Sequence, residues 1–107
     1  MGRAESVNGG LKMAKGYIIA RVSIGDERAY KEYADLARIA MQKYGARILA
    51  RGGRYEAMEG SARPRNVILE FETFEDALRY WKSEEYQDAR KHRLGAAEIE
   101  LCAVEGV

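Results

Sequence analysis

Three stretches of the chain alternate apolar and polar residues with a period of two, and this period predicts β-strands. They cover residues 17–24, 66–71 and 98–103. Each strand has one face that is apolar throughout. Such a face suits packing against a layer of helices.

The second face of these strands mixes apolar and charged residues. Tyr17, Ile19 and Ile68 fall beside Arg21 and Glu70 on it. An apolar patch of this kind usually marks an association site. We therefore expect this face to have a partner.

Two regions repeat apolar residues at three- and four-residue spacings, which predicts helices. The first covers 27–44, follows the candidate N-cap Asp26 and ends before Gly45. The second opens with a capping-box variant at 73–76 and restarts at Ser83.

The restarted helix, 84–94, presents Tyr86, Ala89 and Arg90 toward one side. Its basic run, residues 90–93, holds the only histidine, His92. A lone histidine can move protons or ligate haem. The alternative is a solvated side chain favoured by the helix C-terminus, and no metal-binding constellation accompanies it.

The middle of the chain predicts a strand reversal. A short strand over 47–51 meets the glycine pair 52–53, and residues 54–59 form an extended return segment. A loop over 60–65 follows. The glycine pair is interpreted as structural, because no helix follows it to complete a phosphate-binding loop.

The order strand, helix, strand with hairpin, strand, helix, strand predicts an α+β protein with the ferredoxin-like βαββαβ sandwich. Its four-stranded antiparallel sheet would carry both helices on one face. A two-fold homodimer, sheet face to sheet face, would cover the other.

Composition supports one ordinary domain. The 107 residues are 47% hydrophobic and 33% charged, with a formal net charge of +1. The balanced charge disfavours nucleic-acid binding, and no apolar run is long enough for a membrane span. The single cysteine, Cys102, excludes an internal disulfide and fits a cytoplasmic setting.

The domain is predicted over 15–107, after a flexible N-terminal extension over 1–14. Met1 and Met13 are both candidates for the native start.

Several segments together resemble one known family. They are KGYIIARV (15–22), YGARILARGGRYEAMEG (44–60), RPR (63–65), EF (70–71) and SEEYQ (83–87). The chain is similar, from residue 13 to residue 106, to the family of domain of unknown function 1330 (DUF1330). That resemblance implies the dimeric α/β-barrel superfamily, in which two ferredoxin-like sheets pack into a barrel. Relatives there include cofactor-independent monooxygenases, haem-degrading enzymes and small isomerases, so the fold does not select an activity.

Four arginines, Arg51, Arg54, Arg63 and Arg65, crowd the predicted hairpin and loop. Guanidinium groups bind carboxylates and phosphates through paired hydrogen bonds, so these residues are candidate anion ligands. The alternative is that they pair with glutamates nearby. Arg51 and Arg54, beside the glycines, are the favoured pair.

Glu59 and Glu70, with Arg21, are candidates for a buried charged set in which a carboxylate acts as general base. The alternative is a structural salt bridge. Tyr17 is a further candidate ligand residue, because it lies on the mixed face.

Other aromatic residues, Tyr55, Tyr86 and Trp81, can line a pocket or pack in the core. Cys102 has no basic neighbour to activate its thiol.

We therefore expect a homodimer that binds a small anionic or aromatic metabolite in a cleft edged by Arg51, Arg54 and Glu59. The sequence leaves open whether it also performs a cofactor-free reaction. We expect no cofactor, metal, nucleic acid or membrane partner. The alternative function is a non-catalytic dimeric interaction module.

Overall fold

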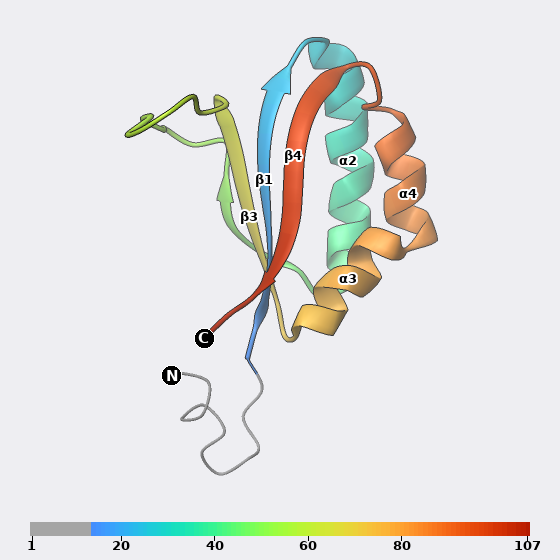
Figure 1. The fold of residues 1–107 in the computed structure, drawn as a ribbon. Helices are drawn as coiled ribbons and strands as arrows, with labels where there is room; N and C mark the ends of the chain where they lie inside the picture. Colours follow the sequence, from blue (N-terminus) through green and yellow to red (C-terminus); the bar gives the residue numbers. More distant parts are fainter. Residues whose placement is uncertain (1–13) are drawn as a thin grey trace.

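The computed structural model describes residues 14–107, and the helices lie together on one side of a twisted sheet (Figure 1). Along the chain the elements are β1 (Gly16–Ile24), α2 (Glu27–Lys43), β2 (Arg47–Arg51), β3 (Arg65–Phe71), α3 (Phe74–Lys82), α4 (Glu84–Lys91) and β4 (Ala97–Glu105). Residues 1–13, on which the predicted extension falls, lie outside the described residues.

The sheet has the order β2-β3-β1-β4, and every neighbouring pair of strands is antiparallel. This confirms the predicted ferredoxin-like α+β fold. In the central strand β1, Ile18, Ala20 and Val22 are buried against the helices, whereas Tyr17 and Ile19 point to the face that no helix covers. We call the latter the open face.

The helices begin where side-chain oxygens satisfy free backbone N–H groups. Asp26 accepts from the backbone N of Ala29 at 3.1 Å, and Thr73 accepts from that of Asp76 at 3.0 Å. Ser83 separates α3 from α4 and is the N-cap of α4. These confirm the predicted helix starts.

The core is a continuous series of aromatic rings between the helices and the sheet. Ring centroids of Tyr30 and Tyr33 are 5.2 Å apart, and those of Tyr33 and Tyr86 are 6.0 Å apart. Tyr86 lies 4.9 Å from Tyr80, which lies 5.3 Å from Phe71. The series joins α2, α4, α3 and β3.

The predicted return segment is wrong in one respect: residues 54–59 do not pair with β2. The backbone N of Gly52 donates to the carbonyl of Asn66 at 2.9 Å, so β2 joins β3 directly. The residues between them leave the sheet as a long loop that projects away from the helices (Figure 1). Their side chains are exposed from residue 53 to residue 61, because this segment has no apolar face to bury.

A β-bulge interrupts β2 between Ile48 and Ala50. Arg47 pairs with Glu70, which points to the open face, whereas Arg51 pairs with the buried Val67. Directly opposed residues share a face. The extra residue therefore turns Arg51 to the helix side of the sheet, where it enters the site described below.

Gly16 marks the closest approach of the sheet to α3. A Cβ added to Gly16 would lie 2.5 Å from the Cα of Phe74 and nearer still to the carbonyl oxygen of Thr73. These are backbone atoms, which cannot move aside as the end of a side chain can. We expect Gly16→Ala to lower the free energy of unfolding by about 2 kcal/mol or more, measured by urea denaturation.

The matched control is Gly53→Ala, because a Cβ at Gly53 meets no heavy atom within 4 Å. This control should change stability by less than about 0.5 kcal/mol. Equal stabilities of the two variants would contradict a tight packing role for Gly16.

Candidate ligand-binding site

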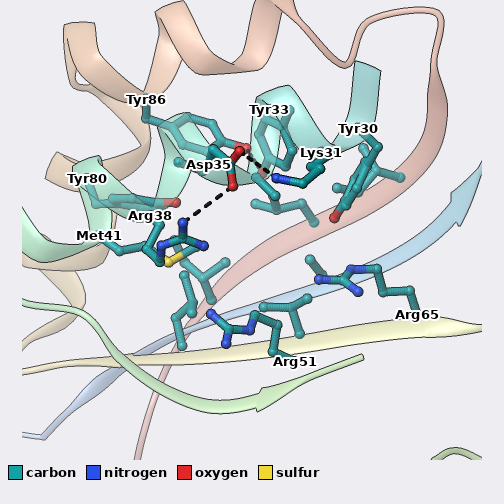
Figure 2. A pocket seen from close by; sticks show the side chains of 18 residues that line it. Tyr30, Lys31, Tyr33, Asp35, Arg38, Met41, Arg51, Arg65, Tyr80 and Tyr86 are labelled. Atoms are coloured by element: carbon teal, nitrogen blue, oxygen red, sulfur yellow. Dashed lines mark hydrogen bonds and ion pairs between the residues drawn. The ribbon is translucent and has the colours of Figure 1, made fainter. Parts of the chain in front are cut away.

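A cavity of about 440 Å³ lies between α2 and the covered face of the sheet. Its floor is formed by apolar strand residues, including Ile18, Ala20 and Leu69. The opposite wall is largely tyrosine: Tyr30, Tyr33, Tyr80 and Tyr86. Figure 2 shows these rings on the helix side, with Arg51 and Arg65 reaching toward them from the strands.

Charged side chains also line this cavity. Asp35 on α2 accepts hydrogen bonds from Lys31 at 3.0 Å and from Arg38 at 3.3 Å (Figure 2). The hydrogen bond from Lys31 lowers the pKa of the Asp35 carboxyl below its ordinary value. Asp35 thus stays ionised at neutral pH, and its single charge is shared by two cations.

Arg51 and Arg65 add two more cations, and no described carboxylate pairs with either. Arg65 is opposite the buried Val22 in the sheet, so it too points to the helix side. Its guanidinium lies 5.3 Å from the ring centre of Tyr30. It also fills the space beside Gly52, where an added Cβ would lie 2.5 Å from Arg65 Nη1.

Two local features therefore explain why position 52 is a glycine. Its φ of +68° is unfavourable for other residues, and its missing side chain makes room for the arginine. Arg65 is held by the ring of Tyr30 and by the space beside Gly52, and no described carboxylate pairs with Arg65 or Arg51. This leaves their charge available to a ligand.

The tyrosine wall is joined to a buried arginine. Tyr33 and Tyr86 share a hydrogen bond of 2.9 Å between their hydroxyl oxygens, and Arg93 Nη2 donates to Tyr86 Oη at 3.1 Å. The Arg93 side chain also lies 5.2 Å from the ring centre of Tyr33. Arg93 is only 5% exposed.

The structure separates the residues that the sequence places in one site. Arg51 lines the cavity, whereas Tyr17, Arg21 and Glu70 belong to the open face on the other side of the sheet. Tyr17 Oη donates to Glu70 Oε2 at 2.9 Å, and this bond raises the pKa of Tyr17. Arg47 Nη1 lies 3.6 Å from Glu70 Oε1.

Arg63 and Arg21 line a shallow pocket of about 290 Å³ at one end of the open face. Arg63 Nη1 donates to Ser23 Oγ and to Glu98 Oε1, both at 3.0 Å. Arg63 Nε also lies 3.6 Å from Glu100 Oε1. Its acidic partners make Arg63 an anchor for the end of the long loop.

Arg54 and Glu59 lie on the exposed long loop and are not among the described residues that line the cavity. The structure therefore does not form the expected cleft edged by Arg51, Arg54 and Glu59, because only Arg51 of these three lines the cavity. The expected charged set of Arg21, Glu59 and Glu70 is also not assembled, because Glu59 is on the loop and Arg21 lies opposite Glu100 in the sheet. Glu70 alone is largely shielded, with its side chain 15% exposed.

The remaining candidates have surface positions. His92 caps the end of α4, and its Nδ1 lies 3.6 Å from Glu32 Oε1. Tyr55 lies half exposed on the long loop, Trp81 stacks against Arg90, and Cys102 is exposed. No group of three potential metal ligands occurs among residues 14–107. Within the same range, no helix has the length and hydropathy needed to span a bilayer.

Arg93 is the main residue that sequence reasoning missed. It belongs to the basic run 90–93, in which sequence reasoning singles out His92 and places Arg90, not Arg93, on the inner side. Arg93 follows Tyr86 by seven residues, or about two helical turns. In the predicted helix 84–94 that spacing puts Arg93 on the same side as Tyr86, and this was the signal available. In the structure α4 ends at Lys91, and Arg93 lies in the turn that follows.

The chain belongs to the family described as "Domain of unknown function (DUF1330)", which it matches over residues 15–107. No curated protein matches the chain in sequence.

Solved structures share the fold at low sequence identity. A protein of unknown function from Rhodopseudomonas palustris has a TM-score of 0.70 at 15% identity, with 99% of this chain and 92% of that chain covered. A dimeric protein of unknown function with a ferredoxin-like fold, from Bacteroides fragilis, has a TM-score of 0.59 at 14% identity, covering 85% and 95%.

A cofactor-independent oxygenase from Streptomyces nogalater has a TM-score of 0.51 at 9% identity, covering 85% of this chain and 91% of that chain. At these identities the likeness shows the fold alone.

The buried tyrosines predict a loss of stability at alkaline pH. Burial raises the pKa of Tyr33 well above its ordinary value and also raises the pKa of Tyr80. Above about pH 10 the unfolded chain releases these protons while the folded chain keeps them, so stability falls as pH rises. In an alkaline pH titration, we expect part of the phenolate absorbance to appear only when the protein unfolds. Circular dichroism measures that unfolding.

Tyr33→Phe should reduce this unfolding-coupled absorbance by about one tyrosine. Tyr55→Phe is the control, because Tyr55 lies half exposed on the long loop and should leave that absorbance unchanged. Full ionisation of all tyrosines in the folded protein would contradict the burial argument.

Proposed function

We propose that this member of the DUF1330 family binds a small organic anion with an aromatic or apolar body in the cavity between α2 and the sheet. The observation that carries the proposal is the pairing of an apolar cavity with the two arginines Arg51 and Arg65, for which no described carboxylate is a partner. The cavity volume of about 440 Å³ lies within the usual range for small-molecule sites.

The charge around the cavity favours an anion. Lys31, Arg38, Arg51 and Arg65 are opposed by the single carboxylate of Asp35. A ligand carboxylate would neutralise part of this excess and accept hydrogen bonds from guanidinium groups, which bind carboxylates in paired geometry.

The uncharged residues that line the cavity indicate the nature of the uncharged part of the ligand. The floor is aliphatic, and the rings of the opposite wall present flat faces suited to an aromatic or planar group. Together these features favour an aromatic carboxylate over a small hydrophilic anion such as phosphate.

The proposal concerns binding. Glu59 and Glu70, the carboxylates expected to move a proton, lie away from this cavity, and Asp35 is held by two cations. The oxygenase from Streptomyces nogalater shares the fold only, so it assigns no reaction to this chain.

We also propose that the protein is a homodimer joined through the open face. Ile19 lies at the centre of this face, opposite Ile68 on one side and Cys102 on the other. Tyr17 and Val104 extend the apolar surface along β1 and β4. The dimeric state of the Bacteroides fragilis protein supports this assembly. In that assembly Tyr17, Arg21 and Glu70 would act at the subunit interface.

The binding proposal predicts affinity for 2-naphthoate, measured by isothermal titration calorimetry. Arg51→Ala and Arg65→Ala should each weaken binding about tenfold or more, because each removes a hydrogen bond to a charged group. The neutral analogue 2-naphthamide should bind weakly and should be little affected by either change.

The matched control is Arg54→Ala, which removes the same charge from the neighbouring loop outside the cavity. Its affinity for 2-naphthoate should stay within about twofold of the unmodified protein. Equal losses in Arg51→Ala and Arg54→Ala would indicate general charge attraction and reject this site.

The dimer proposal predicts that Ile19→Asp raises the dimer dissociation constant by about a hundredfold or more, because it buries an unpaired carboxylate. Sedimentation velocity measures this constant. Ile39→Asp is the control, since Ile39 is 60% exposed on α2 and away from the open face. A monomeric unmodified protein would contradict the proposal.

A further inference from the structure

The hydroxyl groups of Tyr33 and Tyr86 have more protons than their mutual hydrogen bond uses. Two hydroxyls carry two protons, and the bond between Tyr33 Oη and Tyr86 Oη takes one of them. No residue within 14–107 accepts a hydrogen bond from the second hydroxyl proton. Both side chains are among the residues that line the cavity.

The hydrogen bond from Arg93 favours Tyr86 as the donor in the pair of hydroxyls. Its Nη2 donates to Tyr86 Oη at 3.1 Å, so one acceptor position of Tyr86 is taken by a cation. Tyr86 can then donate its own proton to Tyr33, and the proton of Tyr33 points elsewhere. Each bond in such a chain polarises the next, which makes the terminal hydroxyl a stronger donor.

Arg93 is an uncommon group to bury in this setting. It is 5% exposed, its Nε is buried without a hydrogen-bond partner, and no ion pair among the described residues includes it. A buried cation is normally paired with an acid. Its immediate polar neighbours here are two neutral tyrosines, so its positive potential extends toward the cavity wall.

We propose that the chain from Arg93 through Tyr86 to Tyr33 is a second recognition point of the cavity, which donates a hydrogen bond to a neutral oxygen acceptor on the ligand. This inference rests on the proposed function and narrows its ligand class. The ligand carries a carboxylate held by Arg51 and Arg65, and a carbonyl oxygen elsewhere on its apolar body. It is therefore an oxo acid with an aromatic or apolar framework.

The pKa of Tyr33 agrees with a donor role. Burial raises it well above the ordinary value, so the hydroxyl keeps its proton throughout the physiological range. A hydroxyl that keeps its proton can donate a hydrogen bond at every physiological pH. It therefore distinguishes ligands that carry an oxygen acceptor from ligands that lack one. A site built to donate to such an oxygen disfavours an analogue that lacks it, because the donor then stays buried and unpaired.

The test uses two isosteric pairs of probes in which a carbonyl oxygen replaces a methyl group. They are 4-acetylbenzoate with 4-isopropylbenzoate, and 6-acetyl-2-naphthoate with 6-isopropyl-2-naphthoate. The measured quantity is the preference, the Kd of the isopropyl probe divided by that of the acetyl probe, from calorimetry. The benzoate and naphthoate probes differ in the separation between the carboxylate and the acetyl group. Two separations are therefore tested against the distance between the arginines and the tyrosines.

In at least one pair, Tyr33→Phe should lower the preference about fivefold or more, the value of one neutral hydrogen bond. Tyr86→Phe should lower it in the same direction, because it removes the hydroxyl that donates to Tyr33. The control Tyr55→Phe removes a hydroxyl from the exposed loop and should leave the preference within twofold. Circular dichroism and thermal melting establish that each variant is folded.

The outcomes separate the two proposals. Arg51-dependent binding of the probes with a preference unchanged in Tyr33→Phe overturns the oxo-acid inference and leaves the binding function standing. A preference lost in Tyr33→Phe but unchanged in Tyr86→Phe overturns the hydrogen-bonded chain through Tyr86. If 2-naphthoate binds but none of the four probes does, the oxo-acid inference is overturned and the binding function stands. If 2-naphthoate fails to bind as well, or binding does not depend on Arg51, both proposals are overturned.

Discussion

The packing of aromatic rings between the helices and the sheet is the interaction on which the rest of this structure depends. Five rings in series, from Tyr30 to Phe71, connect each helix to the sheet. Such rings are bulky and rigid, so they fill part of the layer but cannot collapse onto the small side chain of Ala20 in the sheet opposite. The space that remains is the cavity, and the same rings supply tyrosine side chains to its wall.

One-sided coverage of the sheet divides the molecule into two regions with different chemistry. The covered face holds a cavity lined by Arg51 and Arg65, for which no carboxylate within residues 14–107 is a partner, and this suits an anionic ligand. The open face holds Tyr17, Glu70 and Arg47 in a connected polar group beside aliphatic residues, which suits a second subunit. The proposed ligand binding and the proposed association can therefore be tested separately, by changes at Arg51 and at Ile19.

Much of the fold was predictable because its signals are local. Alternation along 17–24 and 66–71 depends only on successive side chains, and caps at Asp26, Thr73 and Ser83 depend on neighbours within three residues. Part of the site was predictable too, since Arg51 was a candidate ligand for an anion. The sequence grouped it with Arg54 and Glu59 because closeness along the chain was the available measure of closeness in space.

The chain by itself thus determined the elements, their order and the two unlike faces of the sheet. The tertiary structure decided which charged residues meet. The bulge in β2 places Arg47 and Arg51 on opposite faces, although residues four apart in a regular strand share one. Burial of Arg93 required the packing of α4 against α2. Register and burial are set by contacts between segments distant along the chain, and no local periodicity reports them.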